Sequence, residues 1–110
     1  MKASGDGILD RSVFYFHTAS GFAQELLFYL DSVGHFFCDA RYCVRRASHE
    51  SFLLLYVHTG KCAAQYEGRS YTMQPGEALF IDCHRPHEYR AVELSEIYWV
   101  HFNGNVSRGL

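Results

Sequence analysis

The sequence predicts an all-β domain built as a sandwich or a barrel. Hydrophobic residues make up 48% of the 110 residues, and the chain holds 9 Phe and 8 Tyr. Aromatic and β-branched residues favour strands, and here they gather in short runs separated by turn signals at regular spacing. About eight to ten such strands are typical of sandwiches and barrels. We expect strands over residues 12–17, 26–30, 33–37, 42–45, 51–58, 62–66, 69–73, 78–82, 87–92 and 96–102.

The first elements follow a polar N-terminal segment. Residues 1–11 contain few large apolar side chains, so we expect a flexible arm. Residues 23–30 combine a front that favours a helix with an end that favours a strand. Because the run is short and lacks a convincing N-cap, we expect a strand over residues 26–30. The polar pair Asp31-Ser32 is expected to separate it from the next strand.

The clearest strand is expected over residues 51–58. Its sequence, SFLLLYVH, is apolar at nearly every position, which predicts that both of its faces are covered. Two tight turns then punctuate the chain. At Glu67-Gly68 glycine readily takes the positive φ of a hairpin turn. At Pro75-Gly76 proline presets φ and glycine takes the left-handed position. After the first turn, residues 69–73 are expected to pair back with residues 62–66.

Length and charge exclude several classes of protein. A chain of 110 residues fits one domain, and a formal charge of −2 gives no overall attraction for a polyanion. Arg41, Arg45 and Arg46 form too small a basic group for a DNA footprint. No apolar run approaches the roughly 20 residues that span a bilayer, and the N-terminus lacks the apolar core of a signal peptide. We therefore expect a soluble domain that contacts neither a membrane nor, by itself, nucleic acid.

The cysteines indicate a reducing compartment. Cys38, Cys43, Cys62 and Cys83 are scattered without a Cys-x-x-Cys pair, unlike the dense cysteine patterns of small secreted domains. We expect reduced, mostly buried thiols in a cytoplasmic protein. Cys83 precedes His84, but it ends a buried strand without a cation or helix N-terminus that would lower its pKa. A structural role is therefore expected for Cys83, and nucleophilic catalysis has little support.

The histidines raise the alternative of a metal site. His84 and His87 lie three residues apart at a junction between a loop and a strand. A metal site needs three or four converging His, Cys or carboxylate ligands. The segment before residues 51–58 offers only His49, and the neighbouring Arg45 and Arg46 would repel a divalent ion. We interpret the histidines as hydrogen-bonding groups of a wall or rim, and we expect no metal and no other cofactor.

Strand periodicity points instead to a ligand pocket. His87 and Tyr89 share one face of their strand, and Trp99 shares its face with Ile97 and His101. An aromatic ring with a few oriented donors is a common way to hold sugars and other polar metabolites. A fixed cation, Arg45, suits a carboxylate or a set of hydroxyl groups. In the alternative interpretation, the aromatic residues are ordinary core side chains and Arg45 is a solvated charge.

An ordered set of residues resembles the N-terminal sensor domain of AraC-type transcriptional regulators. The set runs through Gly60, Tyr66-Glu67-Gly68, Tyr71, Pro75-Gly76, Leu79-Phe80-Ile81, Pro86-His87 and Tyr89, and then through Tyr98-Trp99-Val100-His101-Phe102-Asn103-Gly104. Pro75-Gly76 with Pro86-His87 is similar to the second cupin motif, and YWVHFNG is a frequent ending in this group of regulators. The resemblance covers residues 28–104 and implies a cupin-like double-stranded jelly-roll barrel.

The resemblance also implies a function and a site. Such domains bind a small effector, often a sugar or a related metabolite, inside the barrel, and they commonly form homodimers through the outer face and following helices. Arg45, Tyr89 and Trp99 match positions where arabinose-sensing relatives place pocket residues. Those relatives have a His two residues before the Trp, where this chain has Ile97, which argues against arabinose itself. DNA binding is expected only through a C-terminal domain that these residues do not include.

We therefore expect residues 12–110 to form the effector-sensing and dimerisation domain of a bacterial AraC-type regulator, without catalytic activity. The expected ligand is carbohydrate-like, and its expected site residues are Arg45, His87, Tyr89 and Trp99. Two alternatives remain open, a small metal-dependent cupin enzyme and a self-association module whose barrel is filled by side chains. The chain stops directly after an apolar strand, so we expect it to be part of a longer polypeptide.

Overall fold

A computed structural model of the chain describes residues 1–16 and 29–103, and all regular secondary structure in these ranges is β. The strands are β1 (Val13–Phe16), β2 (Tyr29–Cys38), β3 (Cys43–Arg46), β4 (Phe52–Thr59), β5 (Cys62–Tyr66), β6 (Arg69–Met73), β7 (Ala78–Asp82), β8 (His87–Ala91) and β9 (Ser95–Asn103). The all-β prediction is therefore confirmed. No helix in these two ranges is long and apolar enough to cross a membrane.

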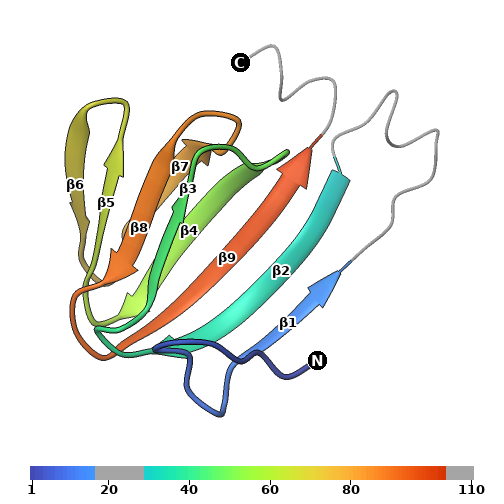
Figure 1. Cartoon of the computed structure of the whole chain (residues 1–110). Coiled ribbons are helices and arrows are strands. Elements are labelled where there is room, and N and C mark those ends of the chain that lie inside the picture. Colours follow the sequence, from blue (N-terminus) through green and yellow to red (C-terminus); the bar gives the residue numbers. More distant parts are fainter. Residues whose placement is uncertain (17–28, 104–110) are drawn as a thin grey trace.

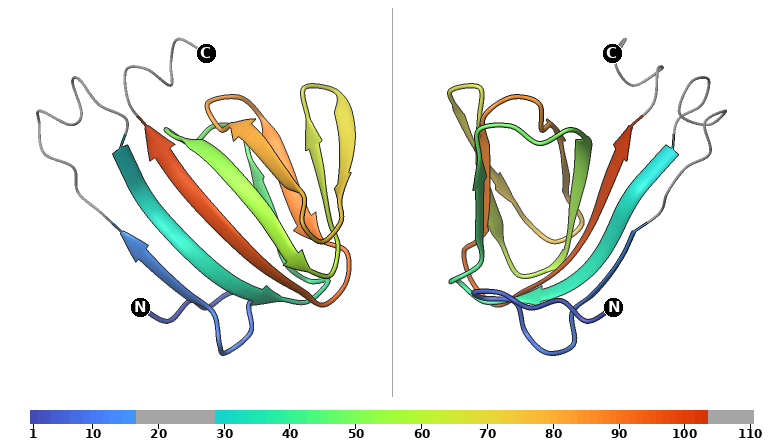
Figure 2. Two further views of the ribbon diagram at one scale, coloured as in Figure 1. Left: turned by 180° about the vertical axis from the view of Figure 1, so that it is seen from behind. Right: turned by 45° about the vertical axis from the view of Figure 1, so that its right-hand side comes forward.

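Two antiparallel sheets face each other. One has five strands in the order β1-β2-β9-β4-β7, and the other has four in the order β3-β8-β5-β6. Figures 1 and 2 show that the sheets come together at one end, where β2 ends and β9 begins, and diverge toward the other end. This is the two-sheet arrangement expected of a jelly roll.

The predicted turns are confirmed. Glu67 and Gly68 both have positive φ, 52° and 76°, and they join β5 to β6 in a two-residue hairpin. Gly76 has φ of 90°, and the Glu77 amide donates a hydrogen bond of 3.0 Å to the Gln74 carbonyl across the second turn. The strands on either side, β5, β6 and β7, have the predicted bounds.

The predicted break at Asp31-Ser32 is wrong, because β2 runs through it. Pairing with β9 continues across this point, with a shift of register between Leu30 and Ser32. A β-bulge of this kind absorbs an extra residue without ending a strand. Most of the strand expected over residues 26–30 lies outside the described residues.

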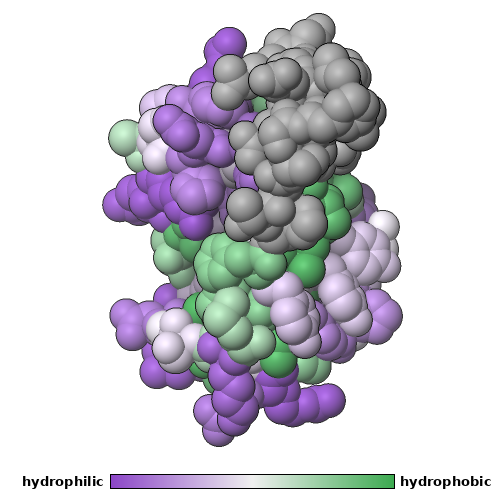
Figure 3. Space-filling view, turned by 90° about the vertical axis from the view of Figure 1, so that its right-hand side faces the viewer, coloured by the Kyte–Doolittle hydropathy of each residue, from purple (hydrophilic) through white to green (hydrophobic). Residues whose placement is uncertain are grey.

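Within the described part of the chain the outer face of β4 is partly exposed, so the predicted cover of this face would have to come from elsewhere. Leu54 on its outer face is 41% exposed, as are Tyr98 on β9 at 41% and Phe80 on β7 at 44%. Leu54 is paired with Phe80 and with Val100 in the sheet, so these apolar side chains form one outer patch. Figure 3 shows a further band of hydrophobic side chains on the side of the molecule where β1 and β2 lie.

The first eleven residues are hydrogen-bonded to the sheet. The Ala3 amide donates to the Ser12 carbonyl at 3.1 Å, and the Leu9 amide donates to the Phe37 carbonyl at 2.8 Å. Gly7 is buried with φ of 77°, where a Cβ would lie 2.1 Å from the Tyr42 backbone nitrogen. Backbone contacts that the sequence does not reveal thus hold this segment along β1 and the end of β2.

The interior between the sheets has two unlike halves. Where the sheets converge, the buried side chains are small or aliphatic, among them Cys38, Val57, Cys62, Met73, Ala91 and Ile97. Where the sheets diverge, the inner face carries polar side chains, among them Ser32, Ser51, His87 and His101, each no more than 7% exposed. We call these the aliphatic half and the polar half.

Candidate ligand-binding site

Strand alternation directs the site residues inward. Along β9 the inner face carries Ile97, then Trp99, then His101, which leads from the aliphatic half into the polar half. Along β8 it carries Tyr89 and His87 in the same direction. The prediction that His87 and Tyr89 share one face, and Trp99 and His101 another, is therefore confirmed.

A cavity of about 390 Å³ lies between the sheets in the polar half, within the usual size range of small-molecule sites. Its walls are mainly aromatic and apolar, and they include Phe14, Phe36, Tyr42, Val44, Tyr89 and Trp99. The polar side chains that reach it include Ser32, Arg46, His49 and His101. The N-terminal segment closes part of the cavity with Ala3, Ser4 and Ile8.

Trp99 occupies its place because β2 has no side chain at Gly34. The two residues are paired in the sheet, and a Cβ on Gly34 would lie 2.1 Å from Cε2 of the Trp99 ring. The ring therefore lies directly over the backbone of β2, edge-on to Phe36 at 5.3 Å and to His101 at 5.3 Å between ring centroids. Gly34 is thus a positioning residue for Trp99, which the sequence alone did not indicate.

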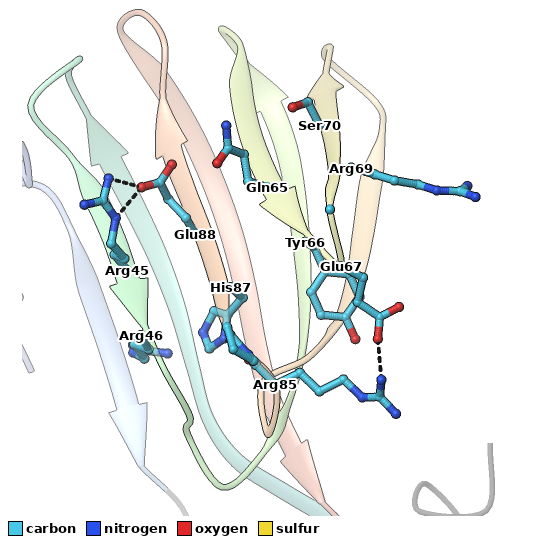
Figure 4. A pocket seen from close by; sticks show the side chains of 12 residues that line it. Arg45, Arg46, Gln65, Tyr66, Glu67, Arg69, Ser70, Arg85, His87 and Glu88 are labelled. Carbon is cyan, nitrogen blue, oxygen red and sulfur yellow. Dashed lines mark hydrogen bonds and ion pairs between the residues drawn. The ribbon is translucent and has the colours of Figure 1, made fainter.

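Arg45 lies outside the cavity. Its side chain is 79% exposed on the outer face of β3, where Nε donates to Glu88 Oε1 at 2.6 Å (Figure 4). The next residue, Arg46, points inward and lines the cavity. Of the two adjacent arginines, Arg46 and not the predicted Arg45 thus lines this cavity. Val44, apolar and two residues before Arg46, was the signal that places positions 44 and 46 on the inner face.

His87 is not among the residues that line this cavity; it is paired with Arg46 across β3 and β8, and both line the hollow drawn in Figure 4. Its ring is 4% exposed, stacks with Tyr89 at 6.3 Å, and has Nδ1 at 2.8 Å from the Arg85 carbonyl. Because a carbonyl only accepts, Nδ1 carries the proton. The buried Nε2 has no hydrogen-bond partner among the described residues, and in the neutral ring it is an acceptor.

Two buried donors also have no partner among the described residues, Nη1 of Arg46 and Nε1 of Trp99. An unsatisfied buried donor destabilises a protein by roughly 1–3 kcal/mol, so such groups are uncommon in folded proteins. These two belong to opposite sheets and line the same cavity. A polar ligand between the sheets would satisfy both.

His49, His101 and Tyr89 in the cavity wall are held neutral near neutral pH. Burial above all, and then the charges of His49, Arg46 and His87, lower the pKa of His101 to about 3. Burial also lowers the pKa of His49 and raises the pKa of Tyr89 to about 12. His101 Nδ1 lies 2.7 Å from the hydroxyl of buried Ser51, which fixes the orientation of the ring.

A second hollow, an open groove of about 740 Å³, lies at the end of the four-stranded sheet (Figure 4). Arg45 reaches it together with Gln65, Ser70 and Glu88 from the outer face. Two of its arginines are paired, Arg45 with Glu88, and Arg85 Nη1 with Glu67 Oε1 at 2.8 Å, whereas Arg46 and Arg69 line it without an ion pair to the described residues. Within residues 1–16 and 29–103, no three His, Cys, Asp or Glu side chains are grouped to hold a metal ion.

Residues 29–109 match the family model of the AraC-like ligand binding domain. The chain belongs to this family. The resemblance drawn from the sequence is thereby confirmed, and the interior cavity becomes the expected position of the ligand in this AraC-like domain. No curated protein matches its sequence.

Solved structures support the fold of this AraC-like domain. It is similar to the cupin domain of an XRE family transcriptional regulator from Enterobacter cloacae, with 14% identity, a TM-score of 0.58, and coverage of 82% of this chain and 94% of the other. A cupin superfamily protein from Desulfitobacterium hafniense shares 10% identity, with a TM-score of 0.61 and coverage of 82% and 75%.

An HTH_3 family transcriptional regulator from Vibrio cholerae shares 16% identity, with a TM-score of 0.60. The match covers 67% of this chain and 43% of that regulator, so the AraC-like domain spans less than half of its length. At these identities the likeness concerns the fold alone, and the proteins from Enterobacter cloacae and Desulfitobacterium hafniense are the two described as cupins.

Proposed function

We propose that this AraC-like domain binds a small polar effector in the cavity of the polar half and thereby acts as the sensing part of a transcriptional regulator, without catalysing a reaction. The observation that supports this most strongly is the pair of unpartnered donors, Arg46 Nη1 and Trp99 Nε1, on opposite walls of an aromatic cavity. A ligand that satisfies both gains affinity from groups that are otherwise left unpaired.

A carbohydrate-like body fits this arrangement. The Trp99 and Tyr89 rings offer faces and edges for C–H groups, and Ser32, His49 and His101 offer polar atoms in the same walls.

The four cysteines are free thiols, and burial raises the pKa of Cys38, Cys62 and Cys83. Free thiols persist in a reducing compartment, so we propose the cytoplasm as the location.

The effector would act by shifting a population of conformations. Ala3, Ser4 and Ile8 line the cavity, so a bound molecule would contact the N-terminal segment as well as the sheets. A ligand favours whichever arrangement of that segment it contacts best. In a full-length regulator, that preference would alter how attached DNA-binding domains are presented.

We also propose that the domain forms a homodimer through the outer patch of the five-stranded sheet. Leu54, Phe80 and Tyr98 are each at least 41% exposed on the adjacent strands β4, β7 and β9. Contiguous exposed apolar surface of this kind marks interaction sites in soluble proteins. Sedimentation equilibrium of the chain and of Leu54→Glu tests this proposal. We expect a dimer that dissociates in the variant, and a monomeric parent chain would contradict it.

The sensing proposal is tested by isothermal titration calorimetry against a broad panel of metabolites, comparing the parent chain with Trp99→Ala. We expect one or more related compounds to bind with a stoichiometry of about one per chain, and the variant to lose that binding while it stays folded by circular dichroism. Unchanged affinity in Trp99→Ala would place the ligand elsewhere. A folded parent chain that binds no compound would contradict the proposal.

A further inference from the structure

The cavity wall carries a fixed positive charge and no negative one among the described residues. Among the described residues that line it, Arg46 is the one with a fixed charge, and there is no Asp, Glu, Asn or Gln. A guanidinium stays protonated at any pH at which proteins are folded. The guanidinium is partly buried and also reaches an open groove, but its Nη1 is out of contact with water and has no hydrogen-bond partner among the described residues, which favours an anion there.

The acidic groups beside the cavity form no ion pair with Arg46. Asp31 and Glu50 line a neighbouring hollow that shares His49 and His101 with the cavity. Asp31 Oδ2 accepts a hydrogen bond from Asn103 Nδ2 at 2.8 Å. No ion pair within 4.0 Å joins Arg46 to a carboxylate of residues 1–16 or 29–103, whereas Arg41, Arg45 and Arg85 each form at least one.

The other titratable groups that face the cavity add no negative charge. Burial raises the pKa of Tyr42 and Tyr89, so both hydroxyls stay protonated near neutral pH. His49 and His101 stay neutral there, because burial lowers the pKa of each. The positive potential of Arg46 is therefore unopposed by the described walls, and it contributes to the lowered pKa of both histidines.

We propose that the effector of this domain is a small organic carboxylate, with its anionic group on Arg46 and its body between the rings of Tyr89 and Trp99. This inference rests on the proposed sensing function and names the class of its ligand. A carboxylate only accepts hydrogen bonds, which suits two unpartnered donors. A neutral sugar also donates from every hydroxyl group, and walls without carboxylate or amide side chains offer it few acceptors.

The proposal is tested with matched pairs of acids and neutral counterparts, glucuronate against glucose and benzoate against benzyl alcohol, extended to a panel of metabolite carboxylates and their alcohols or amides. Calorimetry is run on the full chain, on Arg46→Met and on Arg45→Met, the same change one residue away on the outer face. We expect an acid to bind at least about tenfold more tightly than its neutral counterpart. Arg46→Met should remove this preference, and Arg45→Met should retain it.

A measurement without ligand keeps the test independent of the choice of probe. Replacing an uncompensated cation by an apolar side chain of similar length should raise the melting temperature of the empty chain by about 4 °C or more. The same replacement at Arg45 removes a surface ion pair with Glu88 and should leave the melting temperature unchanged or lower it slightly. An Arg46→Met chain no more stable than the parent would overturn the proposal.

The outcomes separate the two claims. If a neutral compound binds as tightly as its acid, or if Arg46→Met keeps the preference for the acid, the anionic class is wrong and the sensing function stands. If a folded chain binds no member of either set, the sensing function itself fails, and the inference that rests on it fails too.

Discussion

The two halves of the interior are built from the same strands and differ in chemistry. In the aliphatic half, Val57 and Ile97 are paired between β4 and β9, and both are fully buried. Farther along β9, in the polar half, every second side chain again faces inward, and these are Trp99 and His101. The first half fills its space with side chains, and the second encloses a cavity of about 390 Å³.

This difference assigns separate tasks to the halves. Buried aliphatic side chains stabilise the fold through the removal of apolar surface from water. Unpartnered donors and an uncompensated cation do the opposite in the empty protein, and their stabilisation depends on a ligand. Changes in the aliphatic half should therefore act on stability, and changes in the polar half on binding.

Ile97→Ala should have the largest effect on stability. The side chain is fully buried, and a cavity of this kind in a core destabilises the folded state by about 2–5 kcal/mol. Chemical denaturation of the variant measures the loss. Ile97→Val, the milder control, should lose about 0.5–1.5 kcal/mol. A loss below about 1 kcal/mol in Ile97→Ala would contradict the role given to the aliphatic half.

Gly34→Ala should act on both stability and binding. The new Cβ would lie 2.1 Å from the Trp99 ring, so the ring or the strand must shift, and overpacking of this kind destabilises by about 1–3 kcal/mol. The displaced ring should change its fluorescence emission and weaken effector binding. Gly68→Ala, at a hairpin turn with no atom within 4 Å of the new Cβ, is the control for backbone strain alone. An unchanged Trp99 emission in Gly34→Ala would exclude the positioning role.

The stability of the domain should fall in acid because of His101. Its pKa of about 3 in the folded state lies below the ordinary 6.5, so between these values the unfolded chain binds a proton that the folded chain does not. Stability is then lost as pH falls from 6.5 toward 3, by about 2 kcal/mol at pH 5 from this group. Denaturation of His101→Gln at pH 7 and pH 5 should show a smaller difference than the parent chain. An equal difference would contradict the prediction, and His58→Gln, on an exposed position of β4, is the control.

The sequence predicted most of the strands and turns, because the signals for these elements are local. Turn residues such as Gly68 and Gly76 need positive φ, and alternation fixes which side chains of a strand travel together. For this reason it was predictable that His87 and Tyr89 share one face of their strand, and that Trp99 and His101 share one face of theirs.

What the sequence missed depends on contacts between distant segments. The bulge at Asp31 is set by pairing with β9, and the need for glycine at position 34 arises only when Trp99 lies across β2. The prediction of Arg45 in place of Arg46 had a local cause. With two adjacent arginines, it is ambiguous which one faces inward, unless the apolar Val44 is used to decide which face of β3 is the inner one. That single step moves the cation from the surface into the cavity.

Trp99 is the one tryptophan of the chain, so its fluorescence reports on the cavity directly. The most direct test of an effector site in the polar half is a fluorescence titration of the full chain with the compound that calorimetry identifies. The account predicts a saturable change in Trp99 emission with the same dissociation constant as calorimetry, lost in Arg46→Met and kept in Arg45→Met. Saturable binding by calorimetry without any change in Trp99 emission would place the ligand outside the cavity and contradict the account.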